Sequence, residues 1–273
     1  MIKQSVVSGA FYPDDSKELK QMIDLFFLNA ESTKELKPFA VIVPHAGYVY
    51  SGQTAAHVYK IVQQFTYNDA IIIAPSHHAN HINYFIGDYE GYETPFGELK
   101  TNLIKIKHLL KNQEFKFDRV VDLKEHSLEV QLPFLHYINP EIKLIPIIFC
   151  QQNLPNAKKL SRYLNEIIDK DTLLIISTDL SHYHPAKIAE EKDLKLIDFI
   201  KNEDINGFYK AIANRECEAC GFGGLLTLLH MMELFPHSHI DNSFYTHSGK
   251  AYGDNSRVVG YWGGVCVHSS HSI

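Results

Sequence analysis

Short, uniformly apolar runs alternate along the chain with longer segments whose apolar residues recur at helical spacing. The runs 39–43, 70–73 and 173–176 are too short for helices and lack a polar face. Strands of this kind are buried on both faces and are typical of parallel sheets covered by helices. Their alternation with helices predicts an α/β fold, a three-layer α/β/α sandwich with a mostly parallel central sheet.

The remaining elements follow from the same periodicities and from turn residues. Residues 15–29 place apolar side chains on one helical face, and Gly52 marks the expected start of the next helix. Residues 82–98 mix aromatic residues with Gly and Pro, which indicates a hairpin or a long excursion beside the sheet. Further helices are predicted at 53–64, 101–111, 127–138, 155–168, 186–201, 204–213 and 222–234. Further strands are predicted at 143–149, 240–246 and 257–267, and the strand that contains the run 173–176 is expected to cover 172–177. No sequence feature favours a domain boundary, so residues 1–273 are expected to form a single domain.

Three of the buried strands lead into clusters that contain histidine. His45 follows the first strand, and His77 and His78 follow the second. A fourth strand, 143–149, ends without a histidine, so the pattern is selective. The third strand is followed by Ser177, Thr178, Asp179, His182 and His184. Because functional groups gather outside the carboxyl ends of parallel strands, these clusters predict a site at that edge of the sheet.

His45 and His77 could converge on one metal ion if their strands are neighbours. A neutral imidazole offers one lone pair while its other nitrogen is fixed by a hydrogen bond, which makes histidine the commonest metal ligand. The alternative is that each histidine is an ordinary polar loop residue, which requires a coincidence at three strand ends.

A third ligand could be a carboxylate, from Glu129, or a thiolate, from Cys217 or Cys220. The C-x-x-C spacing of the two cysteines also fits a redox pair or half of a four-cysteine zinc site. The zinc site is disfavoured because Cys150 and Cys266 are isolated and form no second pair. The redox pair is disfavoured because no strand precedes the motif as it would in a thioredoxin-like unit.

Cys220 is the better ligand or nucleophile of the C-x-x-C pair. It precedes a helix expected to start near Phe222, and the positive end of a helix dipole stabilises a thiolate.

Acid–base groups accompany the expected ligands. No G-x-S-x-G motif surrounds the serines near Asp179, which disfavours a serine hydrolase. We expect Asp179 to orient a histidine and His182 to act as a general acid or base. His126 and Glu129 are three residues apart and would share a helical face, although Ser127 could equally cap that helix.

Charge and composition narrow the class of partner. The 273 residues carry a formal net charge of −6 and no cluster of basic residues, which argues against nucleic acid or an anionic membrane as a partner. An apolar run of about 18 residues and the apolar middle of a signal peptide are both missing, so a cytoplasmic protein is expected. In that compartment the four cysteines would stay reduced.

Six motifs, taken together and in this order, resemble the Memo family, the B component of the AmmeMemoRadiSam system. They are GAFYP, PHAGYVYSG, APSHH, EHSLEVQLPF, STDLSHYH and ACGFGG, and they extend from Gly9 to beyond Cys220. The resemblance implies a fold similar to the catalytic subunit of class III extradiol dioxygenases, which are non-haem iron enzymes. It also implies association with a radical-SAM partner.

The same resemblance implies a set of site residues. His45, His77 and Cys220 match the metal ligands, and His182 and Asp179 match groups that line the same cavity. Further pocket candidates are His78, His126 and Glu129.

The metal is expected to be one divalent ion, with Fe(II) favoured by the fold and copper or zinc suited to the same ligands. In the dioxygenases the third ligand is a carboxylate, so a cysteine in its place means that ring cleavage cannot be carried over. The first hypothesis is a redox enzyme that uses O₂ or a reduced oxygen species. The alternatives are a non-catalytic module that binds a metal or a peptide, and a zinc hydrolase. The ligand would be a small molecule or a peptide.

Overall fold

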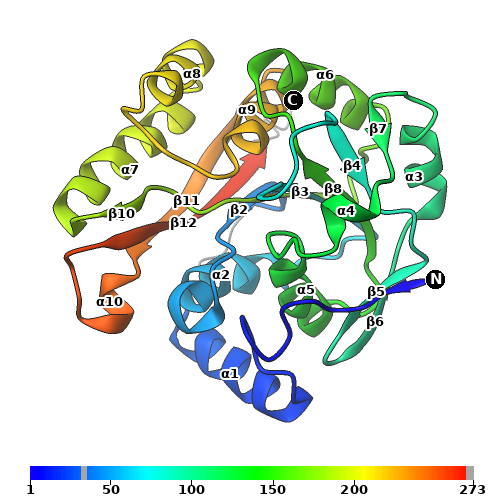
Figure 1. Cartoon of the computed structure of the whole chain (residues 1–273), viewed down its shortest axis with the longest axis horizontal. Helices are drawn as coiled ribbons and strands as arrows, with labels where there is room; N and C mark the ends of the chain where they lie inside the picture. The colour runs from blue at the N-terminus through cyan, green and yellow to red at the C-terminus, as the bar shows by residue number, and fades with distance from the viewer. Residues whose placement is uncertain (32–35, 269–273) are drawn as a thin grey trace.

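The computed structural model describes residues 1–31 and 36–268, and its centre is a nine-stranded mixed sheet (Figure 1). Four neighbouring strands run parallel in the order β2 (Pro38–Val43), β9 (Thr172–Ser177), β3 (Asp69–Pro75) and β8 (Lys143–Phe149). The sheet continues from β2 through β12 (Val258–His268) to β10 (His182–His184) and β11 (Ser238–His247), and from β8 through β4 (Tyr84–Ile86) to β7 (Phe115–Lys116). The predicted parallel centre is confirmed, and antiparallel strands extend it on both sides.

The parallel strands are buried on both faces, as their apolar runs predicted. Ile72 and Val41 belong to one hydrophobic core, whereas Ile71 and Ile42 belong to the other. This alternation follows from the two-residue period of a strand. The sheet therefore separates two cores.

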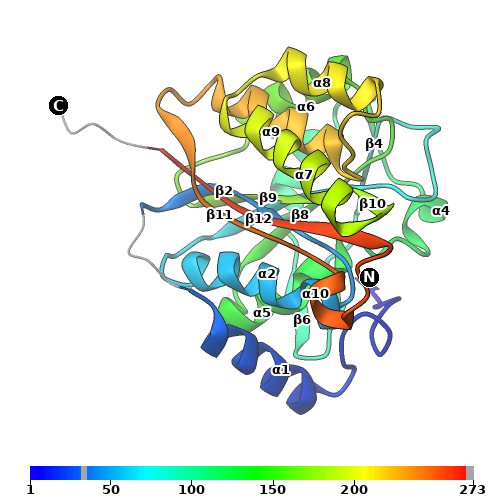
Figure 2. The same cartoon turned by 90° about the vertical axis from the view of Figure 1, so that its left-hand side faces the viewer.

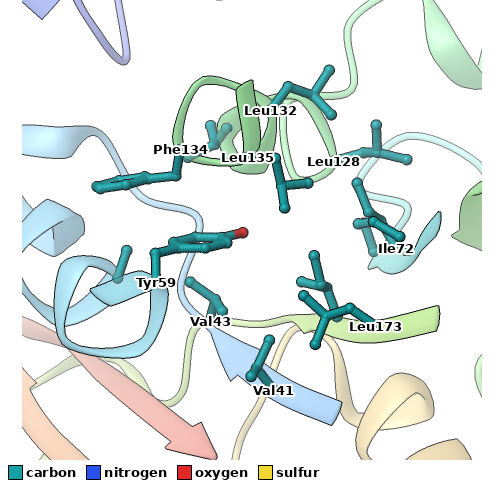
Figure 3. Close-up of a cluster of buried hydrophobic side chains, with 14 of the residues drawn as sticks. Val41, Val43, Tyr59, Ile72, Leu128, Leu132, Phe134, Leu135 and Leu173 are labelled. Carbon is teal, nitrogen blue, oxygen red and sulfur yellow. The ribbon is translucent and has the colours of Figure 1, made fainter. Parts of the chain in front are cut away.

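Helices cover both faces and give the predicted three layers (Figure 2). One face carries α1 (Ser16–Asn29), α2 (Tyr48–Val62) and α5 (Leu132–Ile138). The other carries α6 (Leu154–Asn165), α7 (Ala186–Lys201), α8 (Ile205–Ala213) and α9 (Phe222–Met232). Figure 3 shows Phe134 and Leu135 of α5 pointing toward Tyr59 of α2 and the strand residues beneath them. Within the described part of the chain, no helix is long and apolar enough to span a membrane.

The smaller elements lie around this sandwich. The segment expected to form a hairpin contains β5 (Gly91–Thr94) and β6 (Gly97–Lys100), which pair antiparallel and form a three-stranded sheet with β1 (Ile2–Lys3). Short helices are α3 (Leu103–Leu109), α4 (Arg119–Asp122) and α10 (Gly249–Tyr252).

Two expected helix boundaries were wrong. The second helix begins at Tyr48, so Gly52 lies inside α2, where a Cβ would stand 2.4 Å from the ring of Phe26. Gly52 thus permits close packing of α1 on α2. The helix expected over 127–138 is divided into a 3₁₀ turn, η1 (Glu129–Gln131), and α5, with Pro133 in the first turn of α5. Ser127 is not a cap, because Leu128 holds the N-cap position of η1 without a side-chain cap bond, and the Ser127 hydroxyl donates to the carbonyl oxygen of Pro75 at 2.7 Å.

Candidate metal centre

The site lies where the carboxyl ends of β2, β3 and β9 meet. His45 follows β2 by two residues, His77 follows β3 by two residues, and Asp179 follows β9 by two residues. The register that pairs Val43 with Ser177 keeps these ends level. The predicted placement of the histidine clusters at one edge of the sheet is therefore confirmed.

Three imidazoles converge at this edge. Nitrogens of His45, His77 and His126 all lie within 4.8 Å of one another, and the three residues form a group that could hold a metal ion. The rings of His77 and His126 stack with centroids 4.8 Å apart, and His45 meets both edge-on at 5.4 and 5.5 Å. His45 is buried, whereas His77 opens toward solvent.

Hydrogen bonds fix the proton of His45 on Nδ1. Ser177 Oγ lies 2.9 Å from this nitrogen, donates its own proton to the carbonyl oxygen of Ser127 at 2.6 Å, and accepts from Gln131 Nε2 at 2.9 Å. Because the hydroxyl proton is already used, Nδ1 of His45 must be the donor. Its Nε2 therefore carries the lone pair that a metal requires.

Glu125 has the same effect on His77. Its carboxylate accepts from His77 Nδ1 at 2.9 Å and from the backbone N–H groups of His77 and Ser127 at 2.6 and 3.0 Å. The same carboxylate lies 3.6 Å from Nδ1 of His126. A carboxylate behind a histidine is the usual support of a metal ligand, and it leaves Nε2 of His77 for the ion.

The electrostatics keep two of the three imidazoles neutral. Burial holds the pKa of His45 well below its ordinary value and lowers the pKa of His126 to about 4. Burial also lowers the pKa of His77, but the hydrogen bond and charge of Glu125 outweigh it and the net shift is upward. Burial alone would raise the pKa of Glu125, whereas its bonds with His77 lower it to about 2.

Cys220 lies beside His45, but it is not one of the three residues whose ligand atoms all lie within 4.8 Å of one another. Its Sγ is 3.1 Å from Nε2 of His45 and accepts the backbone N–H of Asp179 at 3.1 Å. The expected start of its helix is confirmed, since α9 begins at Phe222. The expectation that the helix dipole stabilises a thiolate was wrong for the metal-free protein, because burial, and then the charge of Asp179, raise the pKa of the Cys220 thiol.

His182 and Asp179 both reach the same region. His182 Nδ1 donates to the carbonyl oxygen of Leu180 at 2.8 Å, which leaves Nε2 as an acceptor, and burial lowers the pKa of His182. Asp179 positions a histidine through the backbone, because its Oδ1 accepts the N–H of His45 at 2.8 Å. Burial raises the pKa of Asp179 to about 7. With His126, both residues line a pocket of about 510 Å³.

The other candidates lie outside the cluster. The carboxylate of Glu129 accepts from the N–H groups of Val6 and Val7 and from the hydroxyl of Tyr12, at 2.7 to 3.0 Å, so it anchors the N-terminal segment. His78 is exposed. Cys217 is buried in the core that also contains the apolar residues of α9, and burial raises its pKa to about 11, as expected of an inert structural thiol.

Glu125 is the functional residue that the sequence reasoning missed. The signal was present, because the motif EHSLE holds two carboxylates and a metal-binding histidine needs one of them as a support. Helical spacing favoured Glu129, but Glu129 binds the N-terminal segment, and Glu125, which precedes His126, faces the site instead.

This is an α/β protein with a candidate three-histidine metal centre at the carboxyl edge of its parallel strands. Residues 3–265 match the family described as Memo-like protein. A MEMO1 family protein of Aquifex aeolicus is 34% identical over 266 residues, covering 96% of this chain and 98% of that protein. A MEMO1 family protein of Thermoplasma volcanium is 34% identical over 263 residues, covering 96% of this chain and 97% of that protein. The chain belongs to the Memo family.

Among solved structures, an uncharacterized protein of Escherichia coli K12 aligns with a TM-score of 0.46 and 11% identity. The alignment covers 82% of this chain and 98% of that chain.

Proposed function

We propose that this protein is a metal-dependent redox enzyme with Fe(II) at the His45–His77 centre. One observation carries the proposal: the Nδ1 atoms of both imidazoles are held by hydrogen bonds, so their Nε2 atoms keep the lone pairs, and ring nitrogens of the two residues lie within 4.8 Å of each other. Bound iron would supply electrons to O₂ or a reduced oxygen species. The resemblance to non-haem iron enzymes supports iron over zinc and copper.

Two residues compete for the third ligand position. The geometry supports His126 as the third ligand, because one of its ring nitrogens lies within 4.8 Å of ring nitrogens of His45 and His77. Cys220 has the support of the family motif and of its contact with His45 Nε2 at 3.1 Å. Thiolate sulfur and imidazole nitrogen are both common metal ligands, and this contact is short enough for the two atoms to share one ion. We favour Cys220 as the third ligand, with His126 beside the site.

His182 is proposed to move a proton between the reacting ligand and solvent. Its hydrogen bond to Leu180 leaves Nε2 unprotonated, and its lowered pKa keeps the ring neutral near pH 7, so Nε2 can accept a proton. Asp179 acts by holding the backbone of His45 in place. We further propose that the protein works in the cytoplasm, where its free thiols stay reduced, and that it associates with a radical-SAM partner, as the family resemblance implies.

Metal content is the direct test of the centre. Anaerobically purified wild type should hold stoichiometric iron, and His45→Ala should lose it, while the control His108→Ala, an exposed histidine paired with Glu166, should keep it. Cys220→Ser should lose iron and His126→Ala should retain most of it. The reverse result would assign the third position to His126. Wild type that stays metal-free after reconstitution with iron, zinc and copper would refute the centre.

Oxygen consumption tests the redox assignment. Iron-loaded wild type with a reductant should consume O₂ at a rate that His182→Gln lowers at least tenfold without loss of iron. Tight stoichiometric zinc without O₂ consumption would favour the hydrolase instead. Bound iron that leaves O₂ untouched would favour the binding module.

A further inference from the structure

The pocket beside the candidate centre has features that the metal chemistry does not use. Its volume is about 510 Å³, and His126 and His182 form its inner part. Its outer part is formed by Tyr183, Tyr252 and Arg257. Tyr183 and Tyr252 are 63% and 70% exposed, so this wall is open to an incoming ligand.

Tyr183 has a backbone conformation that its residue type disfavours. Its φ of 63° is left-handed, which is unfavourable for a bulky aromatic residue, and it lies where the pairing of β10 with β12 shifts register. Glycine or asparagine would adopt this conformation at lower cost. The strain is compatible with a function, because the irregular backbone presents the Tyr183 ring at the pocket while the neighbouring His182 lines its interior.

Arg257 is a cation placed on that ring. Its guanidinium carbon lies 5.3 Å from the centre of the Tyr183 ring, and no carboxylate in residues 1–31 or 36–268 lies within ion-pair distance of it. An exposed arginine that stacks on an aromatic ring is held in orientation while its N–H groups remain available. Its planar fork matches the two oxygens of a carboxylate.

The charge of the pocket disfavours a ligand with more than one negative charge. Asp179 and Asp254 line the same pocket as Arg257, so the wall carries two carboxylates and one guanidinium. A dianionic phosphate ester would meet repulsion from these carboxylates, whereas a monoanion would not meet it to the same degree.

The rest of the wall is aromatic. Tyr50 and Tyr252 stack with ring centroids 5.2 Å apart and share a hydroxyl hydrogen bond of 2.8 Å. Phe11 packs against the ring of His126 at 4.7 Å, and Tyr261 lies in the buried floor. Flat aromatic surfaces of this kind favour a ligand that is itself an aromatic ring.

We propose that this pocket binds a small aromatic monocarboxylate, with its carboxylate on Arg257 and its ring between the aromatic side chains, directed toward His126 and His182. Tyr183 and Arg257 are then specificity-determining residues. Only the further step, in which the bound molecule is the substrate, rests on the proposed function.

Binding of benzoate, followed by calorimetry on the full chain with and without iron, tests the proposal. Wild type should bind benzoate, Arg257→Gln should weaken it at least tenfold, and Arg257→Lys should recover part of the loss. Benzamide, which lacks the charge, and cyclohexanecarboxylate, which lacks the aromatic ring, should bind at least tenfold more weakly than benzoate. Phenyl phosphate binding more tightly than benzoate would overturn the choice of a monocarboxylate.

Tyr183→Gly separates a functional role from a structural one. Relief of the left-handed strain should leave the melting temperature unchanged or higher, while benzoate binding weakens at least fivefold. Glu203→Gly is the matched control, because Glu203 has a similar φ of 55° and lies outside the pocket. It should gain stability in the same way and bind benzoate as wild type does. Undiminished binding in Tyr183→Gly would overturn its assigned role.

The outcomes distinguish the two proposals. Benzoate binding that survives in metal-free His45→Ala, and still depends on Arg257, would support the pocket even if the metal centre failed its own test. No benzoate binding to iron-loaded wild type would overturn the pocket proposal and leave the metal centre standing.

Discussion

At the residue scale, two hydrogen-bond acceptors, the hydroxyl of Ser177 and the carboxylate of Glu125, decide which nitrogen of each histidine carries the proton. Ser177 has one proton and gives it to Ser127, so His45 must hold its own proton on Nδ1. Glu125 is buried and ionised, so His77 must likewise donate from Nδ1. The lone pairs that both residues could offer a metal ion are therefore set by these neighbours.

Gly260 provides a residue-scale prediction. A Cβ at this position would lie 1.8 Å from Oδ2 of Asp193, whose carboxylate is held by the backbone of Ser181 and the hydroxyl of Tyr245. Because Asp193 cannot withdraw without losing both bonds, Gly260→Ala should lower the free energy of unfolding by about 3 kcal/mol. Urea denaturation would measure it.

Gly47→Ala is the control for this change, since a Cβ there meets its neighbours at 3.5 Å or more and the φ of Gly47 is −55°. Its unfolding free energy should stay close to that of wild type. A Gly260→Ala protein equally close to wild type would show that Asp193 is not fixed.

At the element scale, the centre depends on how loops and helix ends dock on the sheet. The N-terminal segment is tied to η1 by Glu129 and brings Phe11 onto the ring of His126. The start of α9 lies close against the end of β9, because a Cβ at Gly221 would stand 2.6 Å from the carbonyl oxygen of Ser177. This approach places Cys220 against His45.

Glu129→Gln tests the role of this anchor. An amide cannot accept all three hydrogen bonds, so the change should cost about 2 kcal/mol of stability and speed hydrogen exchange at Val6 and Val7. Iron content should be unchanged, because Glu129 contacts the segment and not the ion. Glu18→Gln, at an exposed carboxylate, should leave both properties as in wild type. Loss of iron in Glu129→Gln would make Glu129 a ligand after all.

At the scale of the whole molecule, metal binding should be linked to folding, because the candidate centre joins segments distant in the chain. His45, His77 and His126 meet only when β2 and β3 are in place and the segment before η1 has docked. An ion that binds the folded chain alone adds about 4 kcal/mol of stability at a thousand times its dissociation constant. Iron should thus raise the melting temperature of wild type and leave that of His45→Ala unchanged.

The size of this stabilisation should depend on pH. Glu125 raises the pKa of His77, so protonated His77 stabilises the metal-free fold at low pH, and this contribution is lost as pH rises through the raised pKa. A metal needs the neutral ring, so protons compete with it at low pH. The rise in melting temperature with iron should be larger at pH 8 than at pH 6, as differential scanning calorimetry can determine. An equal rise at both values would exclude His77 as a ligand.

Sequence alone determined the parallel sheet, the edge of the sheet where the histidines gather, and the family of this protein. Apolar runs such as 70–73 could only be buried strands, and parallel strands share one direction, so His45, His77 and the cluster at Asp179 had to reach the same edge of the sheet. The six motifs likewise identified the family that the comparison with Memo-like proteins then showed.

Only the tertiary structure decided which groups face the site. Helical spacing paired His126 with Glu129, but in the folded chain Glu129 binds the N-terminal segment and Glu125 binds His77. The tertiary structure also decided the charge of the Cys220 side chain. The helix dipole alone predicted a thiolate, whereas burial raises the pKa of the thiol. Periodicity describes a chain relative to its own axis, whereas contacts and desolvation depend on how the elements pack together, and that information is not local in sequence.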